Sequence, residues 1–300
     1  MLKGILSMTG ASVILGSLPT INKYILNSGL SSGCIVFYSM LTVSLWSCLI
    51  TIVSKKSFRV SPKKFYFMFI LGSMGMGGTG FLLNISYEYI SVGLTTMLHF
   101  MYPSLVCFLM IFMFKQNLTF LKAGAIVFSI LGMLLILELS SSVNFIGIIT
   151  AILSSISYAF YIIANEKGEI NELPLIVKLF YISSAAAIVF GIQTIASGSL
   201  SLPSSSLVYL QLFGLSGTGS LIAFYLMISG IKVLGASTAS FFNMLEPLIS
   251  LFVSTLCFNE YLSTKTIFGS ILVISSVLFI ALDGLNNIKE TESLGTTIHS

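Results

Sequence analysis

Long apolar stretches alternate with short polar segments along the whole of this 300-residue chain. Each stretch has about the 20 residues that an α-helix needs to cross the hydrocarbon core of a bilayer. Ten such stretches can be marked to within a few residues, at positions 5–26, 34–53, 65–86, 92–114, 120–139, 145–164, 174–196, 207–229, 236–258 and 264–282. The pattern predicts an all-α membrane protein with ten transmembrane helices.

The amino-acid composition also indicates a protein that is surrounded by lipid. Charged residues make up only 8% of the chain, against roughly 25% in soluble globular domains. The hydrophobic fraction is 56% and the mean hydropathy is +1.02. So few charges cannot build a water-facing surface, which argues against a soluble enzyme, and so much apolar side chain excludes a disordered chain. We therefore expect the lipid bilayer to surround the protein.

Basic residues are concentrated in alternate loops. If the N-terminus is cytoplasmic, twelve of the 14 lysine and arginine residues fall on the cytoplasmic side, Lys265 falls outside, and Lys23 lies in the first stretch. Short cytoplasmic loops carry an excess of Lys and Arg in membrane proteins. The bias predicts a protein of the cell (cytoplasmic) membrane with both termini in the cytoplasm.

The second half of the chain repeats the first. Residues 91–103 (SVGLTTMLHFMYP) align without gaps with residues 235–247 (GASTASFFNMLEP). Five helices per half is an odd number, so the two halves would cross the membrane in opposite directions. We predict one five-helix repeat at 1–140, an inverted second repeat at 141–284, and a polar cytoplasmic tail at 285–300. Inverted repeats are typical of secondary transporters, whose binding sites lie near the midplane between the repeats.

These features resemble the drug/metabolite transporter superfamily, and within it the ten-helix transporters of the EamA type. The resemblance is carried by the segment from Gly235-Ala236-Ser237 to Leu245-Glu246-Pro247, by Phe258-Asn259-Glu260 and Gly269, and in the first half by Tyr102-Pro103, Gln116 and Gly124. It covers residues 10–282. It implies two five-helix bundles around a central cavity, alternating access, and transport of a small metabolite.

Glu246 is the most informative single residue. It lies near the middle of the ninth predicted helix, where an ionised carboxylate costs roughly 3 kcal/mol or more. We expect it to face a wet cavity, where it would bind a substrate ammonium group or carry a proton; a structural hydrogen bond to another helix is the alternative. Asn243 lies on the same helical face as a further substrate-binding candidate, and Pro247 is a hinge candidate because it lacks a backbone donor.

His99 and Tyr102 occupy the matching positions in the first half. His99 aligns with Asn243, and because histidine titrates near neutral pH it is a candidate for substrate binding and for proton coupling. Tyr102 aligns with Glu246, and its ring face would attract an organic cation. For both residues, packing inside the bundle is the alternative interpretation.

Three further residues are weaker substrate-binding candidates. Lys23 could meet a substrate carboxylate or pair with Glu88, although snorkelling to the outer interface is the favoured interpretation. Tyr158 and Tyr225 are candidate cavity walls. Pro19 and Pro103 complete the set of hinge candidates.

Several kinds of chemistry find no support in the sequence. There is no P-loop, no metal-ligand spacing, no catalytic carboxylate pair, and no basic patch with interleaved aromatics. The run from Gly75 to Gly80 matches GxGxxG but interrupts an apolar helix, where small residues favour close helix packing. We therefore expect no cofactor, no metal and no nucleic-acid partner.

Together these observations predict a secondary active transporter and not an enzyme. The expected activity is export of a small polar metabolite, such as an amino acid or related amine, coupled to protons through Glu246 and His99. Import of a choline-like organic cation is the alternative, and an intramembrane enzyme acting on lipids is a distant one. The sequence leaves a homodimer open.

Overall fold

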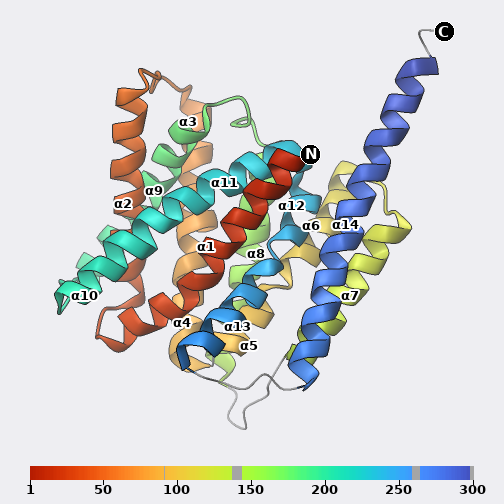
Figure 1. Cartoon of the computed structure of the whole chain (residues 1–300). Helices are drawn as coiled ribbons and strands as arrows, with labels where there is room; N and C mark the ends of the chain where they lie inside the picture. Colours follow the sequence, from red (N-terminus) through yellow and green to blue (C-terminus); the bar gives the residue numbers. More distant parts are fainter. Residues whose placement is uncertain (91, 137–143, 259–263, 298–300) are drawn as a thin grey trace.

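The computed structural model describes residues 1–90, 92–136, 144–258 and 264–297. Every regular element in these ranges is a helix, which confirms the predicted all-α class (Figure 1). In chain order the elements are α1 (Leu2–Asn27), α2 (Ser32–Val53), α3 (Pro62–Ile70), η1 (Leu71–Gly77), α4 (Gly78–Tyr89), α5 (Val92–His99), α6 (Tyr102–Phe114), α7 (Phe120–Ile136), α8 (Phe145–Lys167), α9 (Leu175–Ala196), α10 (Ser206–Tyr209), η2 (Leu210–Thr218), α11 (Gly219–Leu234), α12 (Ala236–Phe242), α13 (Leu245–Phe258) and α14 (Thr264–Thr297). The two η segments are π-helical.

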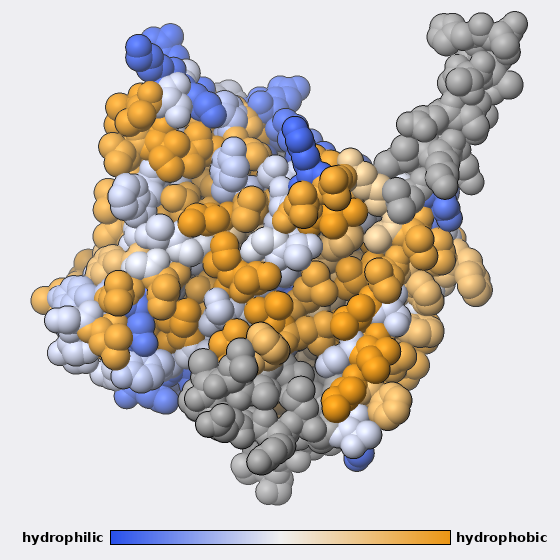
Figure 2. All heavy atoms as spheres, viewed as in Figure 1, coloured by the Kyte–Doolittle hydropathy of each residue, from blue (hydrophilic) through white to orange (hydrophobic). Residues whose placement is uncertain are grey.

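The outer surface suits a bilayer. Eight helical stretches of the described chain are long and apolar enough to cross a membrane, and Phe120–Leu135 is a shorter apolar helix. Figure 2 shows apolar side chains over most of the visible face, with hydrophilic residues mainly toward its upper edge. In Figure 1 the N-terminus, the loop between α2 and α3, and the end of α14 lie toward that same edge. Multi-pass membrane character is confirmed, while the exact count of ten spans remains a prediction.

Two helices are interrupted at equivalent positions of the aligned segments. α5 ends at His99 and α6 begins at Tyr102, while α12 ends at Phe242 and α13 begins at Leu245. Pro103 and Pro247 each fall in the first turn of the second helix of the pair. Proline is tolerated there because the first-turn N–H groups have no helical partner. The prolines therefore lie where the chain restarts a helix, whereas Pro19 lies inside the continuous helix α1.

Helices of each half pack mainly against helices of the other half. α1 of the first half packs on α11 and α13 of the second half, and α8 of the second half packs on α4, α5 and α6 of the first. The π-helical segments follow the same rule, because η1 packs on α9 and η2 packs on α2. This reciprocal packing is the arrangement expected of an inverted repeat, and it brings the interrupted helices to the interface between the halves.

α7 and α14 lie side by side at one side of the molecule (Figure 1). A buried ion pair joins them. Lys122 Nζ lies 3.8 Å from Asp283 Oδ2, and the two side chains are only 7% and 6% exposed. Thr119 Oγ1 also donates to Asp283 Oδ1, at 2.5 Å. Removal of one member leaves a buried charge without its partner, which costs more than the pair itself contributes.

We therefore predict that Asp283→Ala lowers the free energy of unfolding by about 3 kcal/mol, measured as unfolding of the purified protein in detergent micelles. The matched control is Glu169→Gln, which removes the Lys63–Glu169 pair whose side chains are 78% and 53% exposed. Exposed pairs contribute about 0–1 kcal/mol, so this control should differ little from wild type. Equal destabilisation by the two substitutions would show that the α7–α14 pair is not a buried structural contact.

Candidate functional site

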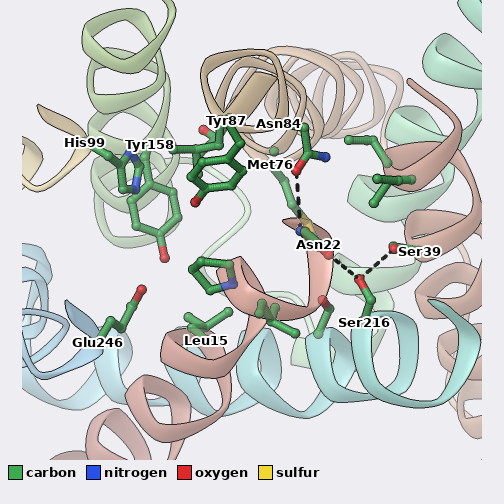
Figure 3. A pocket seen from close by; sticks show the side chains of 18 of the residues that line it. Leu15, Asn22, Ser39, Met76, Asn84, Tyr87, His99, Tyr158, Ser216 and Glu246 are labelled. Atoms are coloured by element: carbon green, nitrogen blue, oxygen red, sulfur yellow. Dashed lines mark hydrogen bonds between the residues drawn. The ribbon is translucent and has the colours of Figure 1, made fainter. Parts of the chain in front are cut away.

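A cavity of about 140 Å³ lies between the two halves of the described chain, and Figure 3 shows part of its lining. Residues from α1, α2, η1, α4 and α5 line it from the first half, and residues from α8, η2, α11 and α13 line it from the second. Typical ligand pockets enclose roughly 300–1,000 Å³. The cavity is therefore smaller than a typical ligand pocket in this conformation, and a metabolite that needs such a pocket fits only if the surrounding helices move apart.

Glu246 lies in the first turn of α13, directly after the interruption. Its backbone N–H donates to the Asn243 carbonyl at 2.8 Å. The side chain lines the cavity, and its Oε1 is buried with no hydrogen-bond partner among the described residues. The ion pairs found in those residues all join other side chains. An ionised carboxylate without a partner in such surroundings is costly, so Glu246 needs either a proton or a cation.

Aromatic rings form the wall beside Glu246. The His99 ring lies 5.1 Å from the ring of Tyr102 and 5.2 Å from that of Tyr158, and the two tyrosine rings lie 4.7 Å apart edge to face. His99 Nδ1 is 2.9 Å from Ser154 Oγ, which fixes the orientation of the imidazole. Figure 3 shows the Tyr158 hydroxyl and the Glu246 carboxylate pointing toward each other. The structure thus brings together three predicted site residues from three separate helices, Glu246, His99 and Tyr158.

Tyr102 and Asn243 stand behind this wall. Both are fully buried, and neither lines the cavity. The Tyr102 hydroxyl and Asn243 Oδ1 each have no hydrogen-bond partner among the described residues. Asn243 Nδ2 approaches Met227 Sδ at 3.8 Å, and the Tyr158 hydroxyl approaches the same sulfur at 3.0 Å. These residues can therefore affect a ligand only through the side chains in front of them or after the cavity has widened.

The opposite wall is neutral and hydrogen-bonded, and the sequence reasoning missed it. Asn22 Nδ2 donates to Asn84 Oδ1 at 3.5 Å, and Asn22 Oδ1 accepts from Ser216 Oγ at 3.3 Å. Ser216 Oγ in turn lies 2.9 Å from Ser39 Oγ (Figure 3). The available signal was the two asparagines inside apolar helices, since polar residues are rare in such positions.

Two further predicted binding residues also lie outside the cavity lining. Lys23 is one residue beyond Asn22, and its Nζ donates to the Tyr87 carbonyl near the end of α1. Tyr225 is 43% exposed on α11, and its neighbour Phe224 lines the cavity instead. Successive residues on an α-helix point about 100° apart, so a shift of one position moves a side chain from the cavity to the outer face.

The hinge candidates differ in position. Pro19 lines the cavity from α1, whereas Pro103 and Pro247 are buried behind it at the helix restarts. Within the described ranges, no group of three or more His, Cys, Asp and Glu side chains could hold a metal ion.

Comparison with known proteins decides the class. The model of the EamA-like transporter family matches residues 2–138 and again residues 145–282. The chain belongs to the EamA-like transporter family. This confirms the resemblance seen in the sequence and assigns the protein to membrane transporters of small molecules, not to enzymes. The two family matches lie inside the predicted repeats, whose own boundaries remain predictions.

Curated relatives are named as transporters. The S-adenosylmethionine uptake transporter of Rickettsia conorii is 30% identical over 185 residues, which cover 62% of this chain and 61% of the relative. The protein of the same name from Rickettsia prowazekii is 28% identical over the same extent. An uncharacterized transporter of Archaeoglobus fulgidus is 26% identical over 241 residues, which cover 79% of this chain and 83% of the relative. The chain thus matches somewhat less than two thirds of the length of the Rickettsia transporters.

A solved structure shows that the fold is shared. A chain described only as "Crystal structure of protein" superimposes with a TM-score of 0.76, over 94% of this EamA-like chain and 98% of the other. The sequence identity is 14%, so the likeness supports the fold alone.

Gly16 sets the distance between α1 and the site helix of this EamA-like protein. A Cβ at Gly16 would lie 2.5 Å from the Glu246 carbonyl oxygen and 2.9 Å from Ile249 Cβ. Helix interfaces in membranes use small residues for such close approach. An added methyl group must therefore push α1 away from α13.

We predict that Gly16→Ala lowers the midpoint of thermal unfolding by several degrees and reduces transport at least about tenfold. Over-packing of a tight interface commonly costs about 1–3 kcal/mol. Gly219→Ala is the matched control, because a Cβ there would lie at an ordinary 3.5 Å from Ile14. If Gly16→Ala unfolds and transports like this control, close packing of α1 against α13 is not needed for function.

Proposed function

We propose that this EamA-like protein transports an amino-acid-derived organic cation of the S-adenosylmethionine class. The observation that carries the proposal is the Glu246 carboxylate, which faces the cavity, has no ion-pair partner among the described residues, and has one buried oxygen without a hydrogen-bond partner there. S-adenosylmethionine bears a permanently charged sulfonium centre. Such a centre can neutralise the charge of the Glu246 carboxylate without any proton. It therefore provides the Glu246 side chain with a positively charged partner.

The aromatic wall supports a cationic substrate. The face of a tyrosine ring attracts a cation within about 6 Å of its centroid. In Figure 3 the Tyr158 side chain points toward Glu246, so one positive centre can contact a carboxylate and a ring together, while His99 lies beside the Tyr158 ring. The wall formed by Asn22, Asn84 and Ser216 offers donors and acceptors to the neutral part of an elongated ligand, such as a nucleoside.

This substrate class unites the two chemistries expected from the sequence. An amino acid or amine and a choline-like cation share a positive nitrogen, and S-adenosylmethionine combines an amino-acid end with an onium centre. The relatives named for S-adenosylmethionine uptake support this class. They also favour uptake over export, so uptake across the cell membrane is the direction that we propose.

Movement follows from the packing. In this proposal the two halves rock about the cavity, and α1 moves as a unit with α13 because Gly16 keeps them in close contact. The restarts at Pro103 and Pro247 provide the positions where α5 and α12 can change angle. Pro19 is the corresponding point in α1.

Proton-coupled export is a second candidate, and it is supported by the buried Glu246 Oε1, which has no hydrogen-bond partner among the described residues. If the empty carboxyl is protonated, each cation that binds displaces one proton, and the cycle exchanges a cation for a proton without moving net charge. With a proton gradient directed into the cell, that exchange drives the cation outward. His99, whose ring lies close to Tyr158, is the neighbouring group that could relay the proton.

We predict that proteoliposomes containing the full chain take up radiolabelled S-adenosylmethionine and that Glu246→Gln reduces uptake at least about tenfold. Loss of one charged contact is worth about 1.5–3 kcal/mol, and each 1.4 kcal/mol is about tenfold. The control is Glu169→Gln, which removes an exposed carboxylate from an ion pair outside the cavity lining. Equal uptake by wild type and Glu246→Gln would remove Glu246 from the binding site, and absence of uptake by wild type would contradict the substrate class.

The two directions make opposite predictions about the driving force. If Glu246 stays ionised when empty, an inside-negative potential set with potassium and valinomycin should raise uptake several-fold, and a pH gradient alone should not. If Glu246 returns protonated, an acidic lumen should drive uptake and the potential should have no effect. The account predicts the first pattern; the second would support proton-coupled export.

A further inference from the structure

A second pocket, of about 510 Å³, opens where α1 and α4 end. Its lining comes from α1, the turn after it, the end of α4 and the segment after α9, and consists of Lys23, Leu26, Asn27, Gly29, Leu30, Ser31, Glu88 and Ser199. Under the orientation predicted from the basic loops, this end of the molecule faces outward. We call this set of residues the outer pocket.

Opposite charges face the outer pocket without pairing. Both Lys23 and Glu88 line it, yet the ion pairs of the described chain do not include either residue. The Lys23 ammonium donates to the Tyr87 carbonyl, and Glu88 Oε1 accepts from Ser32 Oγ. These contacts hold each group in place. They leave further ammonium donors on Lys23 and the second carboxylate oxygen of Glu88 for a ligand.

The outer pocket adjoins the central cavity along two helices. On α1, Asn22 lines the cavity and Lys23 lines the outer pocket; on α4, Tyr87 lines the cavity and Glu88 lines the outer pocket. Each residue proposed to hold the ligand, Lys23 or Glu88, therefore directly follows a residue of the cavity wall in the sequence. The outer pocket lies where a substrate arriving from outside would meet the protein first.

We propose that the outer pocket binds the zwitterionic end of an α-amino acid, with the carboxylate on Lys23 and the ammonium on Glu88. Charge-assisted hydrogen bonds of both signs recognise this group and discriminate against a simple cation or a simple anion. The inference rests on the proposed function where it concerns the transported molecule. S-adenosylmethionine has a free amino-acid end, which the outer pocket would bind. The inference assigns the first contact of that end to the outer pocket, before the onium centre reaches Glu246 in the central cavity.

The test measures binding of L-methionine to the purified full chain in lipid nanodiscs by equilibrium dialysis. We expect wild type to bind methionine, and Lys23→Met and Glu88→Gln each to weaken binding at least about tenfold. Lys23→Arg keeps the charge and the donor to Tyr87, so it should retain binding within about threefold and separate charge loss from misfolding. Lys265→Met is the matched control, because it removes the lysine predicted to lie in an outer loop and should leave binding unchanged.

Truncated ligands assign each charge to its partner. 3-(Methylthio)propylamine lacks the carboxylate of methionine, so Lys23→Met should not weaken its binding further; 4-(methylthio)butanoate lacks the amine, so Glu88→Gln should not weaken its binding further. Absence of methionine binding in wild type overturns the inference. So does a variant, either Lys23→Met or Glu88→Gln, that binds methionine as tightly as wild type. The assay does not involve transport, so such a result is distinct from a failure of S-adenosylmethionine uptake.

Discussion

The site depends on one constraint, which is that a carboxylate inside a membrane protein must have a partner or lose its charge. Glu246 has a buried oxygen without a hydrogen-bond partner among the described residues, and its side chain faces a small cavity between the two halves. A carboxyl group that is left to a proton or a mobile cation is suited to bind and release its partner during a transport cycle.

The interrupted helices explain why Glu246 can occupy this place. α13 begins after two intervening residues, and in its first turn the Glu246 N–H donates to the Asn243 carbonyl at 2.8 Å, outside the regular α-helical pattern. The positive end of the α13 dipole favours an anion at this position. Pro247 lies in this first turn. Gly16 then lets α1 approach the Glu246 backbone closely. The same interruption before Pro103 in the first half places His99 and the Tyr102 ring against Tyr158.

The sequence predicted the coarse architecture well, because hydropathy determines which segments enter lipid and the repeat relates them. It also singled out Glu246 and His99, which both line the cavity, because ionisable groups are rare in apolar helices and one alignment pairs their segments; their roles remain predictions. Tyr225 was predicted to line the cavity, but its neighbour Phe224 does so. The sequence does not determine the rotation of a helix about its axis to within one residue. The Asn22–Asn84–Ser216 wall was missed because its members come from three helices with no common motif.

The most direct test is carbodiimide labelling of the purified full chain, with the modified carboxyl groups located by mass spectrometry. A hydrophobic carbodiimide reacts with a protonated carboxyl that it can reach from lipid or from a cavity, so the labelling is done at mildly acidic pH, where an accessible empty carboxylate takes up a proton. The account predicts that Glu246 is modified in the absence of substrate and that S-adenosylmethionine prevents the modification, while labelling of the ion-paired Asp283 is unaffected by substrate. Modification of Glu246 at the same rate with and without S-adenosylmethionine would contradict the account.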